Sequence, residues 1–174
     1  MNDRLDRILE RWRASRPDLD FAPLEVVARV LRSAHFLQAS LDRIAAAYGL
    51  SHRGDLEVLT ELALVGPLAP SELADTLLLT TGGMTVRLHR LQTKGLIERQ
   101  PNPEDGRGVL ISLTAAGSDL ADDALITLVQ AQAEMIAALE PSSRDELAAL
   151  LRSLLAGLGD IPAFRPSIVA KKDL

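Results

Sequence analysis

Apolar residues recur along most of the chain at the three- and four-residue spacing of amphipathic α-helices. This spacing predicts a short first helix that Pro17 ends and a long helix from about Leu24 to Tyr48. The long helix has an unbroken apolar stripe made of Leu24, Val27, Leu31, Ala34, Leu37, Leu41, Ile44 and Tyr48. Because one chain of this length cannot easily cover this stripe together with those of the last helices, we expect a homodimer.

Three shorter helices are predicted next. The first stops at "VGP", and the second is "PSELADTLL", with Pro70 in its first turn, where proline is favoured. The third runs from about Thr81 to Lys94 and turns Leu88 and Leu91 towards the core.

A β-hairpin is predicted after these helices. The segment "PNPEDGRGVLISLT", from Pro101 to Thr114, joins prolines, acids and glycines, which favour a chain reversal, to alternating apolar residues, which favour a strand. "GLIERQ", just before it, is the expected partner strand. Arg107 lies at the tip between two glycines, which keep the backbone thin there.

Two further helices follow the hairpin. Thr114 is expected to cap a helix that runs to about Leu139, and "SRDE", from Ser143 to Glu146, has the form of a capping box that opens the last helix. Three short helices followed by a hairpin are the order of a winged helix-turn-helix, whose second paired helix enters the major groove.

The predicted fold class is therefore all-α with a small β-wing, a winged helix-turn-helix DNA-binding domain plus a helical dimerisation region. We expect an extra N-terminal helix at 1–17, a dimerisation helix at 18–49, the winged helix-turn-helix at 50–114, C-terminal dimerisation helices at 115–160 and a flexible tail at 161–174.

Composition narrows the class of protein. No apolar run approaches the ~18 residues of a membrane span, and the charged start "MNDRLDRILERW" is no signal peptide. The chain contains no cysteine, so disulfides and thiolate metal sites are excluded. These features indicate a cytoplasmic protein that does not bind a membrane.

The charge of the chain is unevenly distributed. The net charge is −5, yet between Thr80 and Leu110 five basic residues stand against three acidic ones. A local basic patch on an acidic body favours contact with phosphate through one small surface, and argues against nonspecific coating of nucleic acid.

No motif indicates catalysis. The chain has no phosphate-binding loop, no nucleophile elbow and no His-Glu-x-x-His, and His35, His52 and His89 are scattered. "SHRGD", from Ser51 to Asp55, is interpreted as a helix start that Ser or Asp caps. We therefore expect no enzyme, no cofactor and no metal. The alternative is a winged helix used only for protein contacts, which sequence-specific DNA binding would exclude.

Two stretches resemble the MarR family of transcriptional regulators. "DGRGVLISLTAAG" is similar to the family's wing signature, an Asp, a spaced Arg, a strand ending in Leu-Thr and then a Gly, and "KGLIERQPNPED" to its first wing strand and turn. The resemblance is strong from about Leu50 to Gly117, whereas the flanking helices fit the dimerisation region by position only. It implies a repressor that binds a palindromic operator on double-stranded DNA as a homodimer.

The resemblance also implies roles for individual residues. In such proteins the wing arginine, here Arg107, enters the minor groove and the wing aspartate, here Asp105, orients it. A narrow A·T-rich minor groove has the negative potential that attracts a guanidinium. The expected DNA contacts are Ser71, Thr81, Gly82, Gly83, Thr85, His89, Arg90, Lys94, Asp105 and Arg107.

Gly82 and Gly83 are unusual at the start of the expected recognition helix, where each costs about 0.5–1 kcal/mol relative to Ala. Two explanations are open. Bare backbone N–H groups at a helix start can approach a phosphate, or the glycines let a second helix pack closely.

The strings "TTGGMT" and "RGVL", together with an N-terminal tryptophan, are similar to a narrower branch, the urate-responsive MarR proteins. This resemblance implies release from DNA by a small anionic aromatic ligand such as urate or another purine. By motif position it assigns the ligand site to Trp12, Glu57, Arg87 and Arg99. Arginine can bind an acceptor edge of a purine anion with two donors, and indole offers a stacking face.

The chain departs from this branch at several positions. Glu57 stands where the branch has Asp, and Val86, His89 and Gln92 replace residues that are more typically Asn, Asp and Glu. A response to phenolic or other aromatic carboxylates, or no ligand at all, is therefore the alternative.

Structural roles also remain open for the four ligand-site residues. Trp12 lies on an apolar stripe and could pack in the core, Glu57 and Arg87 could form an ion pair, and Arg99 could contact phosphate.

Overall fold

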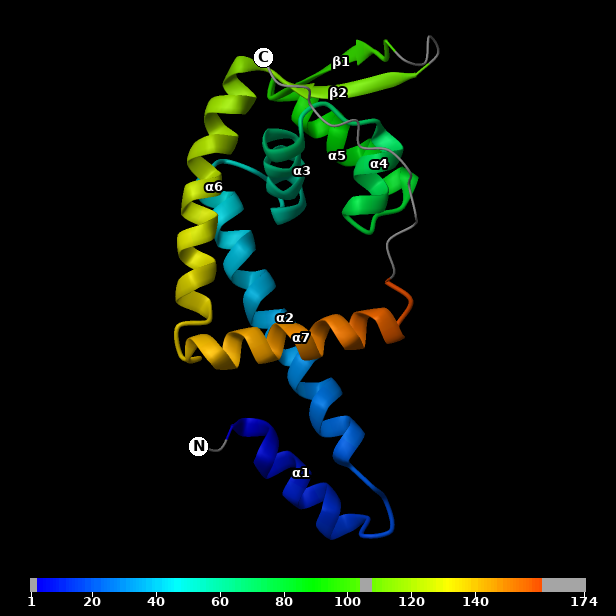
Figure 1. Ribbon diagram of the computed structural model, residues 1–174, viewed down its shortest axis with the longest axis vertical. Helices are drawn as coiled ribbons and strands as arrows, with labels where there is room; N and C mark the ends of the chain where they lie inside the picture. The colour runs from blue at the N-terminus through cyan, green and yellow to red at the C-terminus, as the bar shows by residue number, and fades with distance from the viewer. Residues whose placement is uncertain (1–2, 104–107, 161–174) are drawn as a thin grey trace. The chain divides into compact units, whose positions relative to one another are not determined.

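The structure, a computed structural model, describes residues 3–103 and 108–160. In these ranges the elements are α1 (Arg4–Ser15), α2 (Ala22–Ala47), α3 (Arg53–Val65), α4 (Pro70–Thr76), α5 (Thr81–Thr93), β1 (Ile97–Pro101), β2 (Val109–Leu113), α6 (Ala115–Met135) and α7 (Pro141–Gly157) (Figure 1). The chain divides into two compact units, residues 1–132 and 133–174, so α7 is described by itself. Asp105, Arg107 and the expected tail lie outside the described residues.

α1 begins with a reciprocal cap. The carboxylate of Asp3 accepts hydrogen bonds from the backbone N–H groups of Leu5 and Asp6, and the carboxylate of Asp6 accepts one from the N–H of Asp3. Leu5 and Leu9 are buried where α1 packs against α2. α3 packs against the other end of α2, so the 26-residue helix separates α1 from α3 (Figure 1).

α3, α4, α5 and the hairpin enclose the main core. Its fully buried large side chains are Leu56, Val58, Leu59, Leu73, Met84, Leu88, Leu91 and Ile111. The inward positions predicted for Leu88 and Leu91 are therefore confirmed. Burial of an aliphatic side chain stabilises a fold by roughly 1.5–3 kcal/mol, so this cluster fixes the three helices on the hairpin.

β1 and β2 form a two-stranded antiparallel sheet in which Ile97 pairs with Leu113 and Pro101 with Val109. Pro101 is thus the last residue of β1, beyond the "GLIERQ" expected from the sequence. Leu68, before α4, exchanges two backbone hydrogen bonds with Ile111 at 3.1 and 2.8 Å, which ties the segment before α4 to β2. The order of helices and hairpin is that of a winged helix-turn-helix, as predicted.

α6 is fixed to this domain at two points. At its start, the Thr114 hydroxyl donates to the carbonyl of Gly95 at 2.7 Å and accepts from the N–H of Gly117 at 3.1 Å. Further along, the Tyr48 hydroxyl at the end of α2 lies 2.7 Å from the Thr127 hydroxyl and donates to the Asp123 carboxylate at 3.0 Å.

Three predicted helix ends were wrong. α6 ends at Met135 because the chain tightens into turns with hydrogen bonds between residues three apart, such as Leu139 N–H to the Ile136 carbonyl. α7 begins at Pro141, whose fixed φ suits the first helical position, so "SRDE" lies inside the helix. α3 is capped by His52, whose Nδ1 accepts from the N–H of Gly54 at 2.9 Å.

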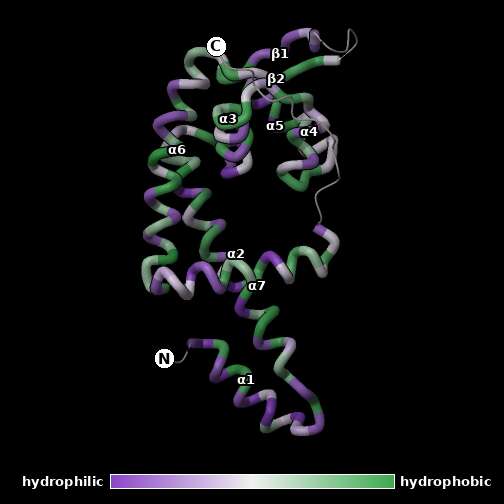
Figure 2. Tube along the Cα trace, in the orientation of Figure 1, coloured by the Kyte–Doolittle hydropathy of each residue, from purple (hydrophilic) through white to green (hydrophobic). Residues whose placement is uncertain are grey.

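Hydrophobic residues occur along the whole of α2 (Figure 2). Several members of its predicted apolar stripe are uncovered in the single chain, including Val27, which is 54% exposed, and Leu31, which is 66% exposed. None of the described helices is both long and apolar enough to cross a bilayer.

Candidate nucleic-acid interface

α5 has one buried face and one exposed face. Thr80 caps it, since its hydroxyl oxygen accepts from the N–H of Gly83 at 3.1 Å, and Met84, Leu88 and Leu91 anchor it in the core. The opposite face, called here the exposed strip of α5, consists of Thr81, Gly82, Thr85, Val86, His89, Gln92 and Thr93. Core packing thus fixes which side chains this helix presents to solvent.

Gly82 and Gly83 do not serve close helix packing. A Cβ at position 82 would meet no heavy atom of the described residues within 4 Å, and one at position 83 would lie 3.2 Å from the Thr80 hydroxyl oxygen. The packing explanation is therefore wrong. The absence of side chains leaves the backbone at Gly82 accessible to an approaching phosphate, while the N–H of Gly83 is bonded to the Thr80 hydroxyl.

The other expected polar contacts lie around this strip. Ser71 is exposed in the first turn of α4. The Thr85 hydroxyl donates to the carbonyl of Thr81 at 2.9 Å. Lys94 follows the last turn of α5, and its ammonium group donates to the carbonyl of Gly49 at 2.9 Å while remaining exposed.

Arg90 has a structural partner that the sequence did not indicate. Its Nη2 and Nε donate to the two carboxylate oxygens of Asp55 at 2.6 and 3.2 Å. The Asp55 side chain is 1% exposed and that of Arg90 is 34% exposed. The hydrogen bond from Arg90 to this carboxylate raises the pKa of the guanidinium.

Arg87 docks on the first turns of α3. Its Nη1 lies 3.4 Å from the Glu57 carboxylate, and its side chain is only 14% exposed. A Cβ at Gly54 would overlap the Arg87 guanidinium. Arg87 can therefore pack against α3 only because position 54 has no side chain. The ion pair of Glu57 and Arg87, which the sequence left open as a structural alternative to a ligand role, is therefore present.

Arg53 extends this ion pair to α2. Its guanidinium lies 3.3 Å from the Asp42 carboxylate and 3.9 Å from that of Glu57. A cavity of about 140 Å³ opens beside these groups, lined by Leu41, Arg53, Leu56, Glu57, Leu128 and Gln132. Two charged residues of α3, Arg53 and Glu57, thus line the cavity, and their ion-pair partners are Asp42 on α2 and Arg87 on α5.

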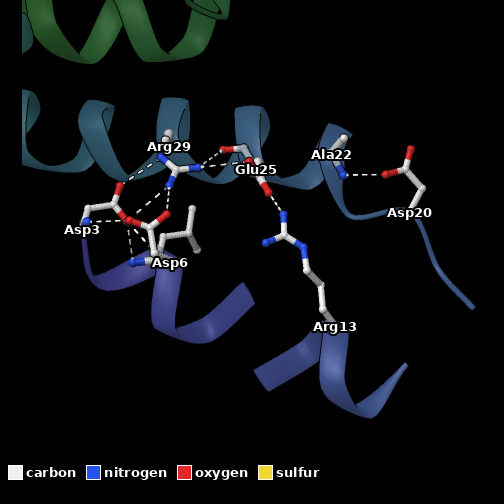
Figure 3. Close-up of polar contacts among 8 residues, drawn as sticks. Asp3, Asp6, Arg13, Asp20, Ala22, Glu25 and Arg29 are labelled. Carbon is white, nitrogen blue, oxygen red and sulfur yellow. Dashed lines mark hydrogen bonds and ion pairs between the residues drawn. The ribbon is translucent and has the colours of Figure 1, made fainter. Parts of the chain in front are cut away.

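Trp12 belongs to α1, which packs against the N-terminal end of α2, far from the Glu57 site at the C-terminal end of α2. Arg29 binds Asp3 at 3.0 Å and Asp6 at 2.6 Å, and Arg13 pairs with Glu25, so α1 is held on the first turns of α2 (Figure 3).

Trp12 is neither a core residue nor a neighbour of Glu57 in the same chain. It is 44% exposed, and its ring lies 6.2 Å from that of Phe21. From Phe21 to Asp42, which is level with the Glu57 site, α2 rises roughly 30 Å at 1.5 Å per residue.

Arg99, on β1, is exposed, and its Nε donates to the side-chain oxygen of Gln92 at 3.2 Å. Of the four residues assigned to the ligand site, the structure brings together Glu57 and Arg87. Among the described residues, neither Trp12 nor Arg99 contacts Glu57 or Arg87.

Sequence reasoning missed Gly54 and Asp55 as neighbours of the α5 arginines, and Arg53 as a partner of Glu57. One signal was available: Asp55 shares its helix face with the buried Leu59 and Leu62, and a carboxylate on an apolar face needs a partner. The identity of that partner, 35 residues away in the sequence, had no local signal.

Comparisons with known proteins agree with this geometry. A model of the MarR family matches residues 48–108. The HTH-type transcriptional regulator PecS of Dickeya dadantii (strain 3937) is 30% identical over 147 residues, 83% of this chain and 88% of PecS. The multiple antibiotic resistance protein MarR of Escherichia coli (strain K12) is 35% identical over 95 residues, 52% of this chain and 65% of MarR.

Solved structures give the same result. A mutant of E. coli MarR in complex with operator DNA matches with a TM-score of 0.69 and 26% identity, over 78% of this chain and 97% of that one. AbsC, a MarR family transcriptional regulator from Streptomyces coelicolor, matches with a TM-score of 0.74 over 82% of this chain and 98% of that one. At 20% identity, AbsC shows the shared fold alone.

Proposed function

The chain belongs to the MarR family of transcriptional regulators, and we propose that it binds a palindromic operator as a homodimer and is released by a small anionic ligand. The relatives it matches are DNA-binding regulators, not enzymes. The observation that carries the proposal is the exposed strip of α5, which offers hydroxyl, imidazole and amide groups on a helix whose other face is buried.

The exposed strip suits the major groove. Thr81, Thr85 and His89 follow one another at four-residue intervals, so they lie in a line along one side of α5. Their hydroxyl and imidazole groups can form hydrogen bonds with base edges, and the open backbone at Gly82 can approach a phosphate. The insertion of Arg107 into the minor groove remains a prediction from the sequence.

A second copy of the chain would cover the apolar residues that α2 leaves uncovered. Val26, Val27, Leu31 and Phe36 are 54–66% exposed in the single chain, and burial of such apolar side chains against a partner is favourable. Two-fold symmetry would also place two α5 helices about 34–36 Å apart, which is one turn of DNA.

Operator binding tests these two points. Duplexes recovered by selection with the purified protein should carry two inverted half-sites, and inserting half a helical turn between them should abolish tight binding. Thr85→Ala and His89→Ala should weaken binding without changing the melting temperature. A monomer at micromolar concentration in sedimentation velocity, with equal affinity for one half-site and two, would contradict the proposal.

The ligand is proposed to act at Glu57 and Arg87. An anion entering the cavity would repel the Glu57 carboxylate that lines it and so weaken the ion pair of Glu57 with Arg87, which lies on the proposed DNA-reading helix. The cavity is about 140 Å³, smaller than the roughly 300 Å³ of a typical ligand site, so it would admit only a small molecule. Coupling of this kind changes DNA affinity by about 5- to 150-fold.

The two remaining residues need separate tests. Trp12 can join this site only from a second copy of the chain, and Arg99 only if it leaves Gln92. Arg53, which borders the cavity, is the more direct cationic partner for an anion.

Operator release by urate, xanthine and aromatic carboxylates separates these possibilities. Glu57→Gln should keep ligand binding but blunt release, because no carboxylate is repelled. If Arg99 belongs to the site, Arg99→Ala should lose release while keeping most DNA affinity; if Arg53 replaces it, Arg53→Ala should do so. If wild type and all variants respond alike to an effective ligand, the site lies elsewhere. If no ligand releases the operator, the chain is a regulator without this switch.

A further inference from the structure

The apolar face of α5 does not by itself fix the orientation of the exposed strip. Met84, Leu88 and Leu91 of α5 are buried in the core. Because apolar packing is non-directional, it allows α5 to rotate slightly about its axis or to shift along it. A directional contact to a rigid neighbour would remove this freedom. The structure contains a two-point contact of this kind in the last turn of the helix, between Arg90 and Asp55, in addition to the single contact of Arg87 with Glu57.

Asp55 is a rigid anchor. It lies in the first turn of α3, where the helix dipole favours a carboxylate, and its residue surface is fully buried. Both carboxylate oxygens accept from one guanidinium, through Nη2 at 2.6 Å and Nε at 3.2 Å. Such a two-point contact fixes the orientation as well as the distance of the arginine.

The same contact limits what Arg90 can do at DNA. The Asp55 contact uses two of the five guanidinium N–H groups, so Arg90 could meet a phosphate only through the others while the pair is kept. Complete transfer of the guanidinium to a phosphate would leave the Asp55 carboxylate buried without its cation, which is strongly destabilising. Asp55 itself cannot reach DNA, since its side chain is 1% exposed. Any effect of Asp55 on DNA binding must therefore pass through Arg90 and α5.

We propose that Asp55 is a positioning residue for DNA binding, which sets the orientation of α5 by holding Arg90, and that this positioning, rather than a phosphate contact, is the main role of Arg90. This inference rests on the proposal that α5 reads DNA. It assigns Arg90 a different role from the phosphate contact expected from the sequence.

Two variants separate the two roles. In Asp55→Asn the two-point contact is weakened while Arg90 is freed, and in Arg90→Lys the positive charge is kept while the planar fork is lost. If the pair positions α5, both variants should weaken operator binding by about tenfold, with an unchanged dependence of affinity on salt. If Arg90 contacts phosphate, Asp55→Asn should bind as tightly as wild type or more tightly, and Arg90→Lys should remain close to wild type.

Asp18→Asn is the matched control. Arg16 holds Asp18 through Nε at 2.8 Å and Nη2 at 2.6 Å, the same two-point geometry, but on the exposed segment between α1 and α2. This variant should bind the operator like wild type. If Asp55→Asn does not fold, Arg90→Lys alone decides between the two roles.

Melting temperatures and temperature-dependent binding complete the experiment. A loss of affinity that disappears on cooling to where each variant is fully folded would show that the pair only stabilises the domain, and would overturn the inference. Thr85→Ala serves to test the premise. If it leaves affinity unchanged, the reading role of α5 is wrong; if it weakens binding while Asp55→Asn does not, only the positioning role is wrong.

Discussion

Gly117, in the first turn of α6, lies so close to the backbone of Leu96 that a Cβ at position 117 would overlap the carbonyl oxygen of Leu96. Thr114 bonds the same two segments, through Gly95 on one side and Gly117 on the other. The final glycine of the motif "LTAAG" is therefore required by the joint between α6 and β1, independently of any contact with DNA.

Gly117→Ala should destabilise the protein by about 1–3 kcal/mol, because the overlap is with backbone, which cannot rotate away as a side chain can. Urea unfolding measures the change. Gly82→Ala is the matched control, since a Cβ at position 82 would meet no other part of the described chain within 4 Å. Equal stabilities for the two variants would contradict the proposed joint.

Gly82→Ala should instead affect DNA. In the helix it should leave stability unchanged or raise it by about 0.5–1 kcal/mol, since Ala loses less backbone entropy on folding. Its methyl group would stand between the start of α5 and a phosphate, so operator affinity should fall several-fold in fluorescence anisotropy. Unchanged affinity would remove Gly82 from the interface.

Gly54→Ala should displace Arg87 without unfolding the protein. The overlapping group is the end of a flexible side chain, which can move to solvent, so the cost falls on the ion pair of Arg87 and Glu57. We expect weaker operator binding and a smaller response to a releasing ligand, both read from binding titrations. A full ligand response in Gly54→Ala would show that this ion pair is not the switch.

Arg107→Ala and Lys94→Ala should weaken operator binding in different ways. Loss of Arg107 should reduce the preference for A·T pairs beneath the wing. Loss of Lys94, if it contacts phosphate, should weaken binding equally across sequences and lower the salt slope by roughly one. Affinities for operators altered at single positions, measured over a range of salt, distinguish the two, and unchanged affinity for Arg107→Ala would remove the wing from the mechanism.

The order of elements could be predicted from the sequence because each helix has its own apolar periodicity and its own start and stop residues. Pro70 opens α4 and Gly95 follows α5, so local rules placed the winged helix-turn-helix correctly. Helix ends were less predictable where several neighbouring residues could each cap the first backbone N–H groups of the helix. At α3 the His52 imidazole takes the cap, while Asp55 turns inward to Arg90.

The candidate site was predictable only in part. Glu57 and Arg87 meet, as their assignment to one site requires, but Trp12 and Arg99 do not join them in the single chain. The distance between Trp12 and Glu57 is set by the length of α2, because α1 and α3 pack against its opposite ends. No local pattern in the sequence indicates where along α2 these two helices pack. Whether these residues bind a ligand stays a prediction.

The division of α5 into two faces has an evolutionary consequence. Met84, Leu88 and Leu91 are committed to the core, and Arg87 and Arg90 to α3, so a change at any of them must be matched elsewhere in the fold. Most residues of the exposed strip have no side-chain partner of this kind among the described residues, although Gln92 accepts from Arg99. Under the proposed reading role of α5, descendants of this protein can acquire new operator preferences by single substitutions at the exposed strip, while Asp55 and Arg90 are constrained to change together.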